Sequence, residues 1–209
     1  LKLVIKYLLT PAKNTDEREV VLIHGRIVII ACFLIAVLAY GCIYSFGVFF
    51  KSLREDLGWS AAATSGVFSL YLLSYCCFGT INGWIVDRFG PKIAITIGGV
   101  FIGSGFLLTS YVYKLWHMYV CYGLLVGIGM SAIYGPLLVT TSRWIHKRRG
   151  LALGIVSSGI GVGNVLLPFL ASHLILQYGW RTSYFIMGSL AGGGIVILAI
   201  LLLKKDPSF

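Results

Sequence analysis

Six long stretches of this chain contain no Asp, Glu, Lys or Arg; they cover residues 27–50, 60–86, 93–113, 115–142, 150–177 and 182–203. An α-helix needs roughly 20 residues to cross the apolar core of a bilayer, so each stretch is long enough to span it. No water reaches that core, and a helix of this length pairs its backbone N–H and C=O groups internally. The chain is therefore predicted to be an all-α membrane protein with six transmembrane helices.

The composition supports this prediction and excludes an ordinary soluble domain. Of the 209 residues, 58% are hydrophobic and 11% are charged, whereas globular domains carry about 25% charged residues. The short alternating strands typical of outer-membrane barrels are not seen in the sequence. The net charge of +10 reflects where Lys and Arg lie along the chain, so no nucleic-acid partner is predicted.

Lys and Arg are distributed unequally between the two sides of the predicted membrane. The N-terminal segment and the loops after the second, fourth and sixth stretches hold thirteen of them, and the remaining loops hold four. Those four are Lys51, Arg54, Lys114 and Arg181. Because positively charged loops stay on the cytoplasmic side, both termini are predicted to be cytoplasmic, in a multi-pass protein of the plasma or inner membrane.

The predicted organisation has three parts: an N-terminal cytoplasmic or interfacial segment at 1–25, the six-helix domain at 26–205, and the start of a central cytoplasmic loop at 206–209. The five cysteines fall inside the predicted spans without the spacing of metal ligands. We interpret them as small packing residues, and we expect no metal and no cofactor. They are Cys32, Cys42, Cys76, Cys77 and Cys121.

A weak internal similarity relates the two halves of the six-helix domain. The stretches DRFGPKIAITIGG (87–99) and LQYGWRTSYFIMG (176–188) align at an offset of 89 residues, with Gly90 over Gly179 and Lys92 over Arg181. They join spans two and three, and spans five and six, on opposite sides of the membrane. Such similarity is typical of inverted three-helix repeats in transporters. Glycines spaced by four are expected to permit close helix packing; these pairs are Gly99/Gly103, Gly123/Gly127 and Gly188/Gly192.

A charged stretch, GWIVDRFGPK (83–92), interrupts the apolar runs between spans two and three. It resembles the loop signature GxxxDRxGR(K/R) of the major facilitator superfamily, with Pro91 where the family usually has Arg. A plain excess of cytoplasmic cations would not explain the acid and the two glycines at this spacing. The matching residues are Gly83, Asp87, Arg88, Gly90 and Lys92.

The resemblance implies a two-state cytoplasmic gate, whose contacts form when the inner mouth is closed and break when it opens. The gate would combine the charged stretch with a basic cluster between spans four and five. That cluster is Arg143, Lys147, Arg148 and Arg149.

Three further stretches resemble monocarboxylate transporters, and the last of them also resembles the related oxalate/formate antiporters of microbes. They are AYGCIYSFGVFF (39–50), RWIHKRRGLALGIVSSGIGVGNVLLP (143–168) and DLGWSAAATSGVFSLYLL (56–73). The resemblance runs from about residue 26 to 205 and covers the first six of the family's twelve helices. It implies a C-terminal six-helix half of the same polypeptide, in which an Arg with a nearby Asp in helix eight supplies counter-charge. Animal members carry a Lys in helix one where this chain has Tyr44, a departure that bears on any Lys-assisted proton step.

The family's arrangement implies a central cavity between helices one and four, with parts of two and five. Tyr40 and Tyr44 are four residues apart and share a face of helix one, and Tyr134 lies inside helix four. Ser157 and Asn164 share a polar stripe of helix five. We expect these five residues to line the cavity, where a phenol could donate to a carboxylate. Alternatively, the tyrosines are interfacial aromatics, and Ser157 and Asn164 join helices by hydrogen bonds.

No charged residue lies in the middle of a predicted span, and no paired carboxylates, His cluster or activated nucleophile is present there, so an enzyme is not expected. The resemblance implies a secondary active transporter of a small monocarboxylate such as lactate or pyruvate, with proton symport favoured over anion exchange. An oxalate/formate-type exchanger or a carrier of another substrate remains open. So does a complete six-helix channel or structural oligomer, which would need a self-complementary interface.

Overall fold

The computed structural model describes residues 15–144 and 149–202, with side chains for 25–144 and 149–201, and within these ranges every regular element is a helix. Residues 1–14 of the predicted N-terminal segment (1–25), and the predicted loop start at 206–209, lie outside the described residues. The first span comprises α2 (Thr15–Tyr44) and α3 (Phe46–Leu57), and it is followed by α4 (Ala61–Phe89) and α5 (Pro91–Thr109). The next comprises α6 (Leu115–Met118), the π-helix η1 (Tyr119–Val126), α7 (Gly127–Ser131) and α8 (Tyr134–Trp144). The last element is α9 (Arg149–Leu202).

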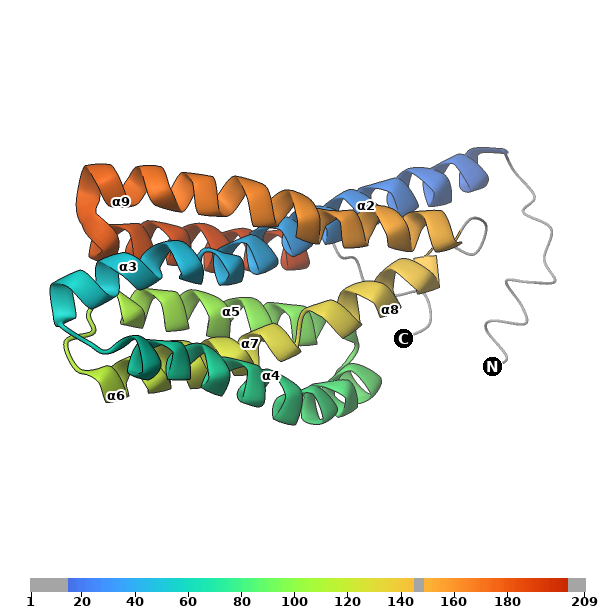
Figure 1. Ribbon diagram of the computed structural model, residues 1–209. Coiled ribbons are helices and arrows are strands. Elements are labelled where there is room, and N and C mark those ends of the chain that lie inside the picture. Colours follow the sequence, from blue (N-terminus) through green and yellow to red (C-terminus); the bar gives the residue numbers. More distant parts are fainter. Residues whose placement is uncertain (1–14, 145–148, 203–209) are drawn as a thin grey trace.

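Five helical segments of the described chain are long and apolar enough to cross a membrane: Gly25–Leu57, Ala61–Phe89, Pro91–Thr109, Leu115–Trp144 and Arg149–Leu201. The last contains two of the six predicted spans. The backbone leaves the helical region at Gly179 (φ 77°, ψ 166°), and the chain reverses direction there, as Figure 1 shows where α9 turns from orange to red. The protein is thus a multi-pass helical membrane protein.

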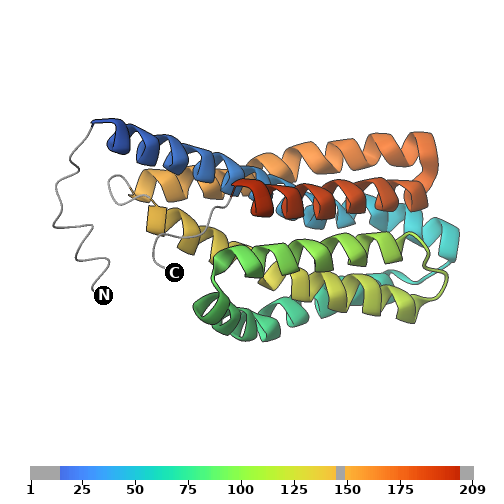
Figure 2. The ribbon, with the colours of Figure 1, turned by 180° about the vertical axis from the view of Figure 1, so that it is seen from behind.

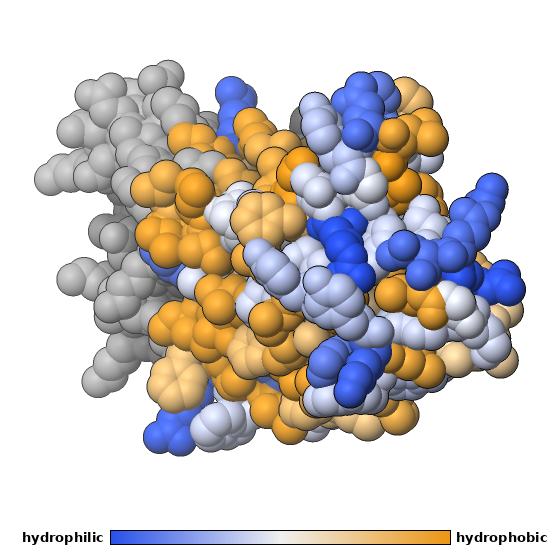
Figure 3. All heavy atoms as spheres, turned by 90° about the vertical axis from the view of Figure 1, so that its left-hand side faces the viewer, coloured by the Kyte–Doolittle hydropathy of each residue, from blue (hydrophilic) through white to orange (hydrophobic). Residues whose placement is uncertain are grey.

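The bundle has two faces and two ends. Figure 1 shows α2, α3, α4, α8 and the first part of α9 toward the viewer, and Figure 2 shows α5 and the second part of α9 side by side on the opposite face. We call the end that carries Gly90, Arg143 and Arg149 the Gly90 end. The end that carries Tyr113 and Gly179 is the Gly179 end, which faces the viewer in Figure 3 with hydrophilic residues gathered between hydrophobic ones.

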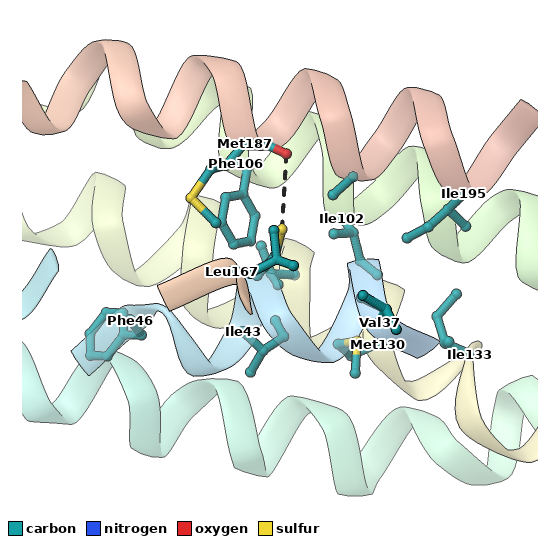
Figure 4. Packing of buried hydrophobic residues seen from close by; sticks show 14 of the residues in the cluster. Val37, Ile43, Phe46, Ile102, Phe106, Met130, Ile133, Leu167, Met187 and Ile195 are labelled. Carbon is teal, nitrogen blue, oxygen red and sulfur yellow. Dashed lines mark hydrogen bonds between the residues drawn. The ribbon is translucent and has the colours of Figure 1, made fainter. Parts of the chain in front are cut away.

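Apolar side chains from most of the helices fill the interior of the bundle. Figure 4 shows Phe106 of α5 beside Met187 of α9, with Ile102, Ile133 and Ile195 further along the same core. All five are fully buried. The Cys42 thiol reaches the Met187 carbonyl at 4.0 Å, which brings α2 against the second part of α9.

Two inverted three-helix units build this core, the first from α2 to α5 and the second from α6 to α9. Their turns match in backbone conformation, because Gly90 (φ 87°, ψ 160°) and Gly179 (φ 77°, ψ 166°) are 89 residues apart. Only glycine adopts such angles readily. Each turn is followed two residues later by a cation whose side chain donates hydrogen bonds to backbone carbonyls outside its own helix. Lys92 donates to the Ile200 carbonyl (2.9 Å), and Arg181 donates to the Ser110 (3.2 Å) and Val112 (2.9 Å) carbonyls.

Close helix contacts lie where the glycine pairs predict them. A methyl group added at Gly188 would lie 2.8 Å from the Phe106 Cβ atom, and one added at Gly127 would lie 2.6 Å from the Ser74 Cβ atom. Another close contact joins Gly41 to Gly163, where an added methyl group would lie 2.7 Å from the Gly163 oxygen. Small residues allow helices in lipid to approach closely enough for backbone contact. The glycine-pair prediction is confirmed.

One packing prediction is wrong within the described chain. Cys32 and Cys42 are buried, but Cys76 and Cys77 are exposed on α4. The sequence places all five cysteines in apolar windows, but it does not say which side of each helix meets a neighbour. Cys76 and Cys77 therefore face surroundings other than the core of this bundle.

A candidate substrate site lined by tyrosines

Three of the predicted cavity residues meet in the structure. The Tyr40 and Tyr44 rings stack with their centroids 6.4 Å apart, and Tyr40 meets the Tyr134 ring edge-on at 5.9 Å. Tyr40 and Tyr44 come from adjacent turns of α2, and Tyr134 begins α8. The spacing of four residues predicted that Tyr40 and Tyr44 share a face of the helix. In the structure that face meets Tyr134, the candidate from helix four.

Two further tyrosines, which the sequence analysis missed, complete this group. Tyr71 and Tyr75 of α4 stack with their centroids 6.4 Å apart. Tyr75 lies near Tyr40, and Tyr71 lies near Tyr44, so the two pairs are neighbours. The missed signal was the spacing, since these tyrosines are also four residues apart. We call Tyr40, Tyr44, Tyr71, Tyr75 and Tyr134 the tyrosine cluster.

The cluster lies where helix four is broken, which the continuous apolar window did not predict. The chain leaves the α-helix at residues 132 and 133, where the Ala132 and Ile133 N–H groups bond three residues back, at 3.2 and 3.1 Å. Pro136, one turn into α8, has no N–H to donate. Within a membrane, non-helical backbone is tolerated only inside protein or beside a cavity. The positive end of the α8 dipole lies beside Tyr134.

The remaining cavity candidates lie on α9, away from its contact with α2. Gly159 packs against α2, where an added methyl group would lie 2.8 Å from the Phe33 oxygen. Ser157 is half-buried and Asn164 is exposed, and the intervening Gly161 has no neighbour within 4 Å of an added methyl group. Among the described side chains, no hydrogen bond joins Ser157 or Asn164 to the tyrosine cluster. They form a separate polar stripe.

The predicted gate residues gather at the Gly90 end. Asp87 is exposed, and the Arg88 guanidinium lies over the Trp84 ring, 5.2 Å from its centroid. Gly83 is exposed, with no atom within 4 Å of an added methyl group. Arg143 is half-buried and Arg149 is exposed. Lys147 and Arg148 lie outside the described residues.

Pro91, the departure from the family signature, occupies the first turn of α5 directly after Gly90. A proline is favoured there because the N–H it lacks has no partner at a helix start.

A polar group at the Gly179 end was not predicted. The Trp180 indole N–H donates to the Asp56 carboxylate at 2.9 Å, joining the end of α3 to α9 across 124 residues. The Arg181 guanidinium lies between the Tyr113 and Trp180 rings, 4.2 and 4.3 Å from their centroids. The sequence gives no signal that pairs Asp56 with Trp180.

Another unpredicted polar contact joins α4 to α7. The buried Asn82 amide donates to the Ser131 hydroxyl at 2.6 Å. A hydrogen bond of this kind holds neighbouring helices together in the bilayer core.

Comparison with known proteins identifies the fold that carries this arrangement. The model of the family described as Major Facilitator Superfamily matches residues 32–209. The chain belongs to this superfamily. The fold is also similar to that of a peptide transporter POT, whose crystal structure was solved in complex with sulfate. The two structures match with a TM-score of 0.70 at 18% sequence identity, over 86% of this chain and 38% of the other.

Curated relatives of this superfamily member include several monocarboxylate transporters. The chain is 30% identical over 188 residues to human monocarboxylate transporter 11, which covers 88% of this chain and 40% of the relative. It is 31% identical over 166 residues to mouse monocarboxylate transporter 3, which covers 79% of this chain and 34% of the relative. The chain thus spans well under half the length of these relatives.

Proposed function

We propose that this chain is the N-terminal six-helix half of a secondary active transporter that moves a small monocarboxylate, such as lactate or pyruvate, together with a proton. The observation that carries this proposal is the tyrosine cluster beside a broken helix, in a chain related to monocarboxylate transporters. Transporter sites commonly lie near the midplane, where discontinuous helices present their ends to the substrate.

The tyrosine cluster is suited to bind the carboxylate group of a small acid. Phenol hydroxyls can donate to carboxylate oxygens, and the N-terminal end of α8 beside Tyr134 adds the positive end of a helix dipole. The apolar windows contain no charged side chain, so this half supplies hydrogen bonds without a counter-ion. The counter-charge and the proton-carrying group would then come from the second half of the transporter.

The second half would dock on helices that this chain leaves open. One side of α4 exposes a row of small residues, and an adjacent side exposes the larger Leu73, Ile81 and Trp84. Small residues favour close helix contact and large apolar ones favour lipid, so the small-residue side of α4 would face the second half. Its small members are Ser65, Ser69, Cys76, Thr80 and Gly83, and Leu72 is the one large exposed residue among them.

Alternating access would rock the two halves about the tyrosine cluster. With both termini cytoplasmic, the Gly90 end is the inner end. Asp87, Arg88 and Arg149, exposed there, would make contacts across the inner mouth when it is closed. Ser157 and Asn164 would line the other side of the cavity.

Uptake of radiolabelled pyruvate into proteoliposomes tests the proposal on the full-length polypeptide. We expect uptake driven by an inward proton gradient and weakened at least tenfold by Tyr134→Phe, which removes one hydrogen bond to a charged group. Tyr111→Phe, an exposed phenol at the Gly179 end, is the matched control and should leave uptake unchanged.

Three results would contradict the proposal in different ways. Uptake that requires an anion inside the vesicles and does not depend on the proton gradient would indicate anion exchange. Uptake of other solutes but of no carboxylate would assign a different substrate class. Passive flux with saturation absent would favour a channel.

A further inference from the structure

The tyrosine cluster presents aromatic rings where a site for a two- or three-carbon acid would need only small apolar contacts. Tyr44 is 46% exposed, and Tyr40, Tyr75 and Tyr134 are half-buried. These residues come from α2, α4 and α8, so the rings converge from three helices. An occupant of the site would meet ring faces and edges on several sides.

Buried aromatic residues hold these rings in place. Tyr71, which is 4% exposed, packs on Phe68 at 5.2 Å and on Tyr122 at 6.3 Å between ring centroids. Tyr122 is fully buried and donates to the Ile43 carbonyl at 3.2 Å, one residue before Tyr44. The base of the cluster is therefore fixed by packing and by a backbone hydrogen bond. A site of this kind is pre-organised and gives a preference for the ligand shape that it fits.

Ring-on-ring contact favours an aromatic ligand beyond the area that it buries. Offset-stacked and edge-to-face pairs with centroids 4.5–7 Å apart add to the hydrophobic term, whereas a methyl group gains from buried area alone. The Tyr40 ring already makes one contact of each kind, with Tyr44 and with Tyr134. Tyr44 itself is exposed on one side, so its ring is accessible to a further contact.

We infer that this site takes carboxylates with a planar aromatic body in preference to short aliphatic acids. The inference rests on the proposed function and names its substrate class. The aromatic body would lie against the Tyr44 and Tyr134 rings, and the carboxylate would accept hydrogen bonds from phenol hydroxyls and face the second half of the transporter.

Phenylpyruvate and pyruvate form a matched pair for the test, because they share a 2-oxo acid group and differ by one phenyl ring. With the full-length polypeptide in proteoliposomes, we expect a KM for phenylpyruvate roughly five- to tenfold below that for pyruvate, the effect of one aromatic contact. Tyr44→Leu should bring the ratio of the two KM values close to one. Tyr44→Phe, which keeps the ring, should retain the preference, as should the control Tyr111→Leu.

The outcomes separate this inference from the function on which it rests. Equal KM values in the unmodified protein, or a preference that survives Tyr44→Leu, overturn the aromatic preference and leave monocarboxylate transport standing. Transport of neither acid, with the protein present in the vesicles, overturns both. If Tyr44→Leu fails to reach the membrane, competition of unlabelled phenylpyruvate against labelled pyruvate in the unmodified protein and in Tyr44→Phe still decides.

Discussion

Gly103 of α5 lies directly against Gly192 of α9. A methyl group added at Gly103 would lie 2.7 Å from the Gly192 Cα atom, and one added at Gly192 would lie 2.6 Å from the Gly103 Cα atom. The two glycines are 89 residues apart, so each is the other's counterpart in the repeat. A residue that contacts its own counterpart lies on the twofold axis that relates the two units. The axis therefore passes between α5 and α9 at this contact.

The first prediction concerns this contact. Gly103→Ala and Gly192→Ala should each destabilise the protein by about 1–3 kcal/mol, because the added methyl group meets backbone that cannot yield. Gly193→Ala is the matched control, since nothing lies within 4 Å of its added methyl group. Thermal unfolding in detergent, followed by the monodisperse fraction on gel filtration, measures the difference. Equal stability of the Gly103 and Gly193 variants would contradict the close contact.

A second prediction concerns the cations that follow the two turns. Arg181→Gln should lower stability by about 1–3 kcal/mol, because it removes charge-assisted hydrogen bonds to two carbonyls and the contact with two rings. Lys92→Gln should cost less, since its single bond to Ile200 is exposed. Lys114→Gln, exposed at the Gly179 end, controls for loss of positive charge. The same unfolding assay applies, and a larger loss for Lys92→Gln than for Arg181→Gln would contradict this ranking.

A third prediction concerns the contact between Gly66 of α4 and Tyr119 of η1. The Tyr119 hydroxyl donates to the Ala63 carbonyl at 2.9 Å and occupies the space that a Gly66 side chain would fill. Gly66→Ala should therefore displace the phenol and destabilise the protein by about 1–3 kcal/mol. The Gly66→Ala/Tyr119→Phe double variant should recover part of the loss. Gly79→Ala, with no neighbour within 4 Å, should be neutral or slightly stabilising.

A fourth prediction separates the two exposed cysteines. Cys76 lies on the small-residue side of α4, near Tyr71, whereas Cys77 lies on the side of Leu73 and Trp84. In the full-length transporter, a water-soluble maleimide should label Cys76 when the two halves part on this side of α4, and substrate should slow that labelling. Cys77 should react poorly because it faces lipid. Single-cysteine variants and mass spectrometry measure both rates; faster labelling of Cys77, or none at Cys76, would place the cavity elsewhere.

The sequence predicted what depends on length and periodicity. The spans, the offset of 89 residues and the shared face of Tyr40 and Tyr44 all follow from local pattern. It did not predict the break before Tyr134, because a bend in an apolar helix leaves hydropathy unchanged. The prediction that all the cysteines are packed in the interior was wrong for Cys76 and Cys77, because burial depends on how each helix is rotated about its axis.

Contacts between distant segments could not be predicted from the local sequence pattern either. Trp180 and Asp56 are 124 residues apart, and the residues around each of them do not indicate that the two pair. Tyr71 and Tyr75 had the right spacing to be found. Without the position of α4, however, nothing tied them to Tyr40 on α2.

The packing of Gly41 against Gly163 has a consequence for how the protein is made. These residues are 122 positions apart, and they bring α2 against the first part of α9. A ribosome adds about 5–20 residues each second, so α2 enters the bilayer several seconds or more before its partner exists. During that interval its glycine-bearing face must be covered by lipid, by the translocation machinery or by another helix. The helix α2 therefore reaches this final neighbour only after the first part of α9 has been synthesised.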